Sequence, residues 1–153
     1  MKLVDPRLLN PDFSDFLEIF QKYQVESILV GGYAVVAHGY HRTTGDLDVW
    51  VNPTAENYLR MSKAFSVFGL PIDSVEKRAF LDPEDDDVFR FGRTPLAIDI
   101  LTKVKGLEFD SCFESADKLK IGGIVFSLLS LKDLKTAKRA AGRNKDLDDL
   151  ENL

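Results

Sequence analysis

Residues 27–52 decide how this chain folds, and they have the sequence SILVGGYAVVAHGYHRTTGDLDVWVN. The apolar run at 25–30 predicts a strand, the two glycines end it, and residues 33–38 predict a short buried helix. A second strand is expected at 46–51. Strand, glycine turn, helix and strand in this order predict a sheet with helices packed on it.

The flanking segments extend this pattern. Asn10 followed by Pro11 is typical of a helix start, and an aromatic stripe at helical spacing follows it. Further strands are expected at 88–91, 96–101, 118–121 and 124–128, and further helices at 54–68, 72–81, 109–113, 131–141 and 145–153. We expect an α+β fold with a small mixed β-sheet flanked by helices. It should form one domain over residues 1–153, with the C-terminal helices of residues 130–153 packed on it.

The composition is that of a globular protein, with 44 % hydrophobic and 29 % charged residues. The net charge of −5 argues against a general polyanion binder, so any nucleic-acid contact would need a local basic face such as residues 132–145. The single cysteine, Cys112, excludes an internal disulfide. No apolar run has membrane-spanning length, and residues 1–9 do not resemble a signal peptide. We expect a cytoplasmic protein that does not bind a membrane.

Three aspartates indicate a metal site. Asp46 and Asp48 project from the same face of the second strand because side chains alternate along a strand. Two adjacent carboxylates repel each other unless a cation compensates them. Asp99 lies in the apolar run LAIDIL, where a buried carboxylate needs a partner. An exposed strand face remains the alternative for the first pair. The sequence predicts that all three hold Mg²⁺ (or Mn²⁺) in one site.

The glycine pair Gly31-Gly32 is the predicted phosphate cradle, because a glycine turn before a helix leaves backbone N–H groups exposed. A tight corner without a ligand is the alternative. His38 and His41 flank the site loop. A structural role is the expectation for both, and a contact with a substrate phosphate is the alternative for His41. The acidic run at 82–87 predicts a solvated loop.

The order Gly31-Gly32, Asp46-Leu47-Asp48 and Asp99 resembles the polymerase-beta-type nucleotidyltransferase superfamily. Within it, GGYAVVAHGYHRTTGDLDVWV and DLKTAKRAAGRNKDLDDL are similar to the abortive-infection nucleotidyltransferase toxins and their small relatives. The resemblance covers residues 25–153. It implies the nucleotidyltransferase fold. One departure is Gly32, which stands where serine is commoner, so a hydroxyl contact to phosphate is missing.

The resemblance implies an enzyme that transfers a nucleoside monophosphate from an NTP, ATP among them, to an acceptor hydroxyl. The acceptor can be tRNA, a protein or a small molecule. A role in toxin–antitoxin pairs or phage defence would add a cognate antitoxin as partner. The substrate-binding residues that the resemblance implies are Arg42, Thr44, Lys138, Arg143 and Asp146. The alternative is a catalytically inactive module of the same fold that binds a nucleotide or a partner.

Overall fold

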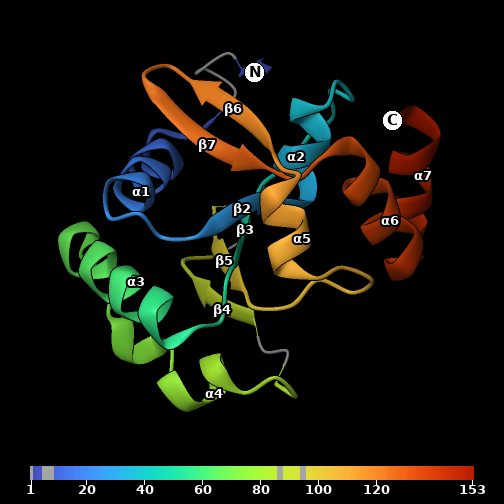
Figure 1. Cartoon of the computed structure of the whole chain (residues 1–153). Helices are drawn as coiled ribbons and strands as arrows, with labels where there is room; N and C mark the ends of the chain where they lie inside the picture. The colour runs from blue at the N-terminus through green and yellow to red at the C-terminus, as the bar shows by residue number, and fades with distance from the viewer. Residues whose placement is uncertain (1, 5–8, 86–87, 94–95) are drawn as a thin grey trace.

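The computed structural model describes residues 2–4, 9–85, 88–93 and 96–153. Its strands form one seven-stranded sheet with the order β1-β6-β7-β2-β3-β5-β4 (Figure 1). Parallel pairs such as β3–β5 and antiparallel pairs such as β2–β3 both occur, so the sheet is mixed. The predicted α+β class with a mixed sheet and flanking helices is therefore confirmed.

The bounds of the elements follow the chain. The strands are β1 (Lys2–Val4), β2 (Ser27–Val30), β3 (Leu47–Val51), β4 (Val88–Phe91), β5 (Ile98–Leu101), β6 (Asp117–Ile121) and β7 (Ile124–Leu128). The helices are α1 (Pro11–Lys22), α2 (Gly31–Ala37), α3 (Ala55–Phe68), the 3-10 helix η2 (Ile72–Ser74), α4 (Lys77–Leu81), α5 (Phe109–Glu114), α6 (Leu131–Ala141) and α7 (Asn144–Asn152). Among the described residues, no helix combines the length and apolar character needed to span a bilayer.

Helices α1 and α3 cover one face of the sheet with aromatic side chains. The ring of Phe65 in α3 lies 5.1 Å from that of Phe91 in β4 and 6.2 Å from that of Phe20 in α1. Phe91 is paired with Ile98, and Ile98 with Leu47, so these side chains share one face. This face is the main apolar core.

The opposite face carries Asp48 and Trp50, which alternate with Leu47 and Val49 along β3. The ring of Trp50 lies 5.2 Å from that of Phe109, so α5 covers part of this face. In Figure 1, α5 lies in front of the central strands, and α6 and α7 lie beyond it on the right. The start of β3, which carries Asp48, borders the space between the sheet and helices α6 and α7, and a site can form there.

Several boundaries differ from the sequence prediction. Strand β3 begins at Leu47 instead of Asp46, because the Asp46 carboxylate accepts a hydrogen bond from the Ala97 N–H (3.1 Å) outside the ladder. Helix α2 begins at Gly31, two residues before the predicted start, since Gly31 has a φ of +68° and turns the chain directly into the helix. The helix predicted at 72–81 is divided into η2 and α4.

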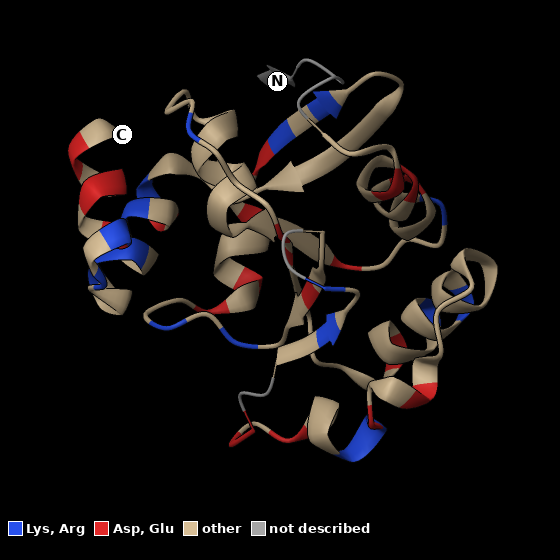
Figure 2. Ribbon diagram, turned by 180° about the vertical axis from the view of Figure 1, so that it is seen from behind, with Lys and Arg blue, Asp and Glu red and all other residues tan. Residues whose placement is uncertain are grey.

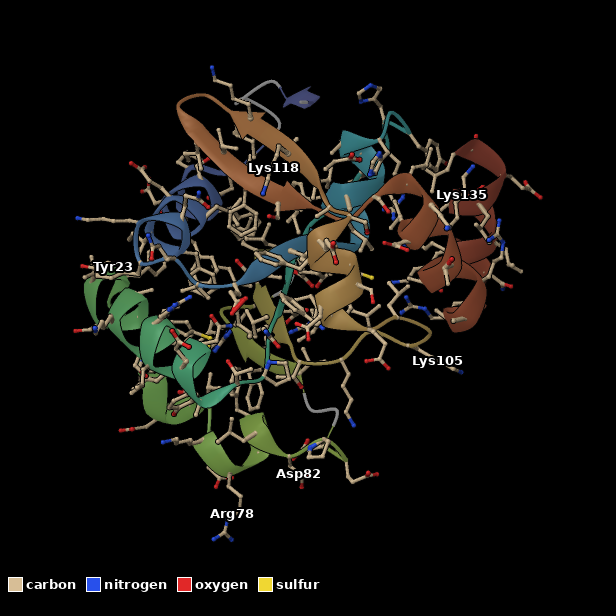
Figure 3. The ribbon with its side chains drawn as sticks, viewed as in Figure 1. Tyr23, Arg78, Asp82, Lys105, Lys118 and Lys135 are labelled. Atoms are coloured by element: carbon tan, nitrogen blue, oxygen red, sulfur yellow. The ribbon has the colours of Figure 1, made fainter. Side chains whose placement is uncertain are left out.

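Two further differences concern segments that local patterns describe poorly. Strand β1 was not predicted, because its only strand partner in the described sheet is β6, more than a hundred residues later (Lys2 pairs with Leu119). In the acidic loop, Asp82 is exposed and projects from the chain just after α4 (Figure 3), while residues 86–87 lie outside the described residues. Residues 94–95 of the predicted turn between β4 and β5 also lie outside them.

The start of α3 depends on one buried amide. The Asn57 side chain accepts a hydrogen bond from Glu26 N–H (2.7 Å) and donates to the Glu26 and Asn52 carbonyls (3.0 and 2.9 Å). Asn57→Ala should lower the free energy of unfolding by about 2–4 kcal/mol, because these buried backbone groups lose their partner. Urea unfolding measures this. The exposed Asn152→Ala should change it by less than about 0.5 kcal/mol, and an equal effect of the two substitutions would contradict the prediction.

Candidate active site

The centre of the site is a pair of carboxylates on neighbouring strands. Strands β3 and β5 run parallel, and Asp48 is the register partner of Asp99. Paired residues project from the same face of a sheet, so the two side chains lie next to each other. Asp46, fixed by the Ala97 N–H, lies two residues before Asp48. The structure therefore brings together the three aspartates that the sequence predicted.

The diglycine bend lies directly against this acid group. Val30 pairs with Asp48 across β2 and β3, which places Gly31 beside the Asp48 carboxylate. A Cβ on Gly31 would overlap Asp48 Oδ2, and a Cβ on Gly32 would overlap the Thr44 hydroxyl. Neither position can hold a side chain while its neighbour stays in place. Both glycines are needed for close approach, in addition to the positive φ of Gly31.

Arg90 belongs to this group, and the sequence analysis missed it. Strand β4 pairs with β5 so that Arg90 is the register partner of Asp99. The Arg90 Nε and Nη2 donate to the two Asp99 oxygens (2.8 and 2.9 Å), and Nη2 also lies 3.4 Å from Asp46 Oδ2. Its sequence context, Val-Phe-Arg-Phe, gave one signal, a charge alternating with aromatic residues. Only the strand register identifies its partner.

A second charge cluster connects the C-terminal helices to the loop before β3. Lys138 Nζ lies 3.2 Å from Asp146 Oδ1 and 3.0 Å from Asp149 Oδ2. Arg42 in that loop donates to both oxygens of Asp149 (2.7 and 2.9 Å). Arg143 Nε donates to Asp146 Oδ2 (2.6 Å). Asp149 is the second residue that the sequence analysis missed, although it lies in the quoted DLDDL segment.

Hydrogen bonds keep both buried carboxylates of this cluster ionised. Burial raises the pKa of Asp146 and of Asp149, but the hydrogen bonds from Arg143 and Lys138 to Asp146, and from Arg42 and Lys138 to Asp149, outweigh it. Both pKa values therefore lie below the ordinary range of an aspartate. Lys138 is only 7 % exposed and is held by two carboxylates, so it forms part of the wall rather than a mobile cation.

One cavity of about 560 Å³ collects these groups. All ten residues predicted as catalytic, metal-binding or substrate-binding line it: Gly31, Gly32, Arg42, Thr44, Asp46, Asp48, Asp99, Lys138, Arg143 and Asp146. Arg90, Lys103, Lys105 and Lys145 line it as well. In Figure 3, Lys105 lies on the loop that leads into α5, and Figure 2 shows the mixed charges of α6 and α7. The cavity thus has an acidic floor and basic walls.

The two histidines, His38 and His41, lie outside the set of described residues that line the cavity. His38 Nε2 lies 2.7 Å from the Leu129 carbonyl oxygen, which connects the end of α2 to the segment after β7. His41 is exposed. Neither is among the described residues that line the cavity. His38 therefore has a structural contact, and the predicted phosphate contact of His41 stays a prediction.

The Asp48 carboxylate is partly buried beside the carboxylate of Asp99, and this surrounding raises its pKa. Burial, and next the negative charge of Asp99, raise the pKa of Asp48 from 3.8 to about 7. Lys145 lies close enough to oppose this shift. In the described part of the chain, no three His, Cys, Asp or Glu side chains stand as they would around a metal ion. The carboxylate oxygens of Asp46, Asp48 and Asp99 are nevertheless donors of the kind that a hard divalent cation prefers.

The sequence matches no protein-family model and no curated protein.

The raised pKa of Asp48 gives a pH dependence of stability. The folded protein binds this proton more tightly than the unfolded chain does. The contribution of Asp48 to the free energy of unfolding therefore falls as pH rises from about 4 to about 7 and then stays constant. In EDTA, Asp48→Asn should therefore stabilise the protein more at about pH 8 than at about pH 5, as measured by urea unfolding. The exposed Asp15→Asn is the control, and a pH-independent effect of Asp48→Asn would contradict the prediction.

The cluster around Lys138 should dominate the attachment of α7. Asp149→Ala removes the partner of Arg42 and one of the two carboxylates at the buried Lys138, and should lower the free energy of unfolding by about 3–5 kcal/mol. The neighbouring Asp148 is exposed, and its carboxylate accepts one hydrogen bond among the described contacts, from the Tyr40 hydroxyl. Asp148→Ala should therefore cost less than about 1 kcal/mol. Thermal and urea unfolding compare the two, and similar losses would show that Asp149 does not attach the helix.

Proposed function

We propose that this protein is a metal-dependent nucleotidyltransferase that moves a nucleoside monophosphate from an NTP to an acceptor hydroxyl. The observation that carries the proposal is the convergence of Asp46, Asp48 and Asp99 beside Gly31 in one cavity. Asp46 bonds the Ala97 N–H and Asp99 bonds Arg90, but the crowding of three carboxylates against a glycine bend still opposes folding through their mutual repulsion. A divalent cation with a phosphate ligand would compensate them.

The three aspartates would hold Mg²⁺ or Mn²⁺ through their oxygens. Such an ion, when bound, stabilises negative charge on a transferring phosphoryl group. Asp99 is also the proposed base toward the acceptor. In the transfer, the acceptor oxygen forms a bond to the α-phosphorus, the bond from that phosphorus to the pyrophosphate oxygen breaks, and the acceptor proton passes to the Asp99 carboxylate. Pyrophosphate leaves.

The walls of the cavity support a polyanionic substrate. Lys103, Lys105 and Lys145 are exposed at the cavity and form no ion pair with a described residue. A triphosphate brings the negative charge that three exposed ammonium groups attract. The cavity volume of about 560 Å³ also lies within the range of about 300–1,000 Å³ that small-molecule sites occupy. We assign the triphosphate to these lysines and to the N–H groups of the diglycine bend.

The acceptor is proposed only by class, as tRNA, a protein or a small molecule that carries a hydroxyl. The nucleotidyltransferase fold, the cytoplasmic location, and a place in a toxin–antitoxin pair or in phage defence with a cognate antitoxin belong to the same proposal. The fold and the biological roles rest on the resemblance of the segments at 31–51 and 133–150, whereas the proposed cytoplasmic location rests on the use of a single cysteine, Cys112.

A catalytically inactive nucleotide- or partner-binding module is the second candidate. The observation that favours it is the Arg90 guanidinium, which occupies both oxygens of Asp99. An aspartate held in this way has part of its charge neutralised and fewer lone pairs left for a metal ion or a proton. The two candidates differ in whether pyrophosphate is released.

Transfer of label from an α-labelled NTP tests the enzyme. Asp48→Asn and Asp99→Asn should each lower label transfer by about 100-fold or more, because each removes charge that the reaction centre needs. The exposed Asp15→Asn should keep wild-type transfer, and circular dichroism should show that all variants are folded. Binding of NTP with Mg²⁺ but without pyrophosphate release, over RNA, protein and small-molecule acceptors, would instead identify the inactive module.

A further inference from the structure

The Arg90 guanidinium stands among the acid groups that would hold the metal ion. Two parallel hydrogen bonds of 2.8 and 2.9 Å join it to Asp99, and a third contact of 3.4 Å reaches Asp46. Two-point pairs of this kind are the strong form of an arginine–carboxylate contact. The same Asp99 oxygens are the ones that a cation would need. The two positive groups therefore compete for the charge and the lone pairs of one carboxylate.

We propose that Arg90 is the resident cation of the acid site and that a divalent ion binds tightly only when Arg90 leaves Asp99. This inference rests on the proposed function, because it takes the three aspartates as the metal site. Arg90 is thus a positioning residue that keeps the acid group compact in the absence of metal. It competes with the ion for the same carboxylate.

The position of Arg90 allows this exchange. Strand β4 is the last strand in the described sheet order, so Arg90 enters the site from a sheet edge. Its side chain is 50 % exposed, while the side chain of Asp99 is 9 % exposed. The arginine can move toward water with little loss of packing, whereas the aspartate cannot follow it. The guanidinium is therefore the more exposed partner of the pair, and the one that can turn toward water.

The exchange favours arrival of the metal together with an anion. A divalent ion alone must displace a well-placed guanidinium and leaves that positive charge beside its own. A polyphosphate that enters with the ion gives the displaced Arg90 a new negative partner in the same cavity, which Arg90 lines. The wild-type protein should therefore bind the bare ion weakly.

Titration with Mn²⁺ alone, followed by the electron paramagnetic resonance signal of the unbound ion, measures the competition. Arg90→Gln should bind Mn²⁺ about tenfold more tightly than the wild type. Arg90→Lys keeps the charge but cannot donate to both Asp99 oxygens in parallel, so it should also bind more tightly than the wild type. Loss of structure would weaken binding, so a gain in affinity is not the result of damage to the fold.

Two controls separate the outcomes. Arg93→Gln removes a nearby exposed charge from the same hairpin and should change the affinity less than twofold. Adding Asp99→Asn to Arg90→Gln should abolish the gain. Equal or weaker Mn²⁺ binding by Arg90→Gln, with binding still lost in Asp99→Asn, would overturn the role of Arg90 and leave the metal site intact. Absence of Mn²⁺ binding in every variant would overturn both the inference and the metal dependence of the proposed function.

Discussion

Asp48 and Asp99 face each other across the parallel pair of β3 and β5, and the local structure compensates only part of the negative charge that this register concentrates. Arg90 reaches Asp99 from the next strand, which β4 brings into register. Gly31, without a Cβ, leaves room for the Asp48 carboxylate beside the bend. Asp48 itself keeps a raised pKa because it is buried and lies near Asp99. A sheet does not place two aspartates opposite each other for stability alone, since like charges in register are unfavourable.

The second cluster has the opposite character, because its charges are balanced. Lys138, Arg42 and Arg143 surround Asp146 and Asp149, and both carboxylates have lowered pKa values. This network fixes α6 and α7 to the loop that carries Thr44, and so it forms one wall of the cavity. Few apolar side chains of these helices join the main core, with Leu134 buried in it and Leu153 packed against it. The wall is therefore held largely by ion pairs.

The charged residues of the two clusters therefore have different roles. The balanced cluster is part of the framework, because Lys138 is buried and paired with Asp146 and Asp149, and its predicted contact with a substrate stays a prediction. The acid floor and the exposed lysines around it are incompletely compensated within the described residues, which is typical of a site that awaits ligands. Arg90 is the described cation that pairs with this floor, through both oxygens of Asp99.

The sequence by itself determined the mixed α+β class, the start of α1 at Asn10 and Pro11, and the three aspartates and two glycines that line the cavity. Each follows from a local rule, such as alternation along a strand or a capping residue. The sequence did not determine β1, the partner of Arg90 or the role of Asp149. Tertiary structure alone decided these, because each contact joins residues whose spacing in the chain carries no signal, and because strand register chooses which side chains meet.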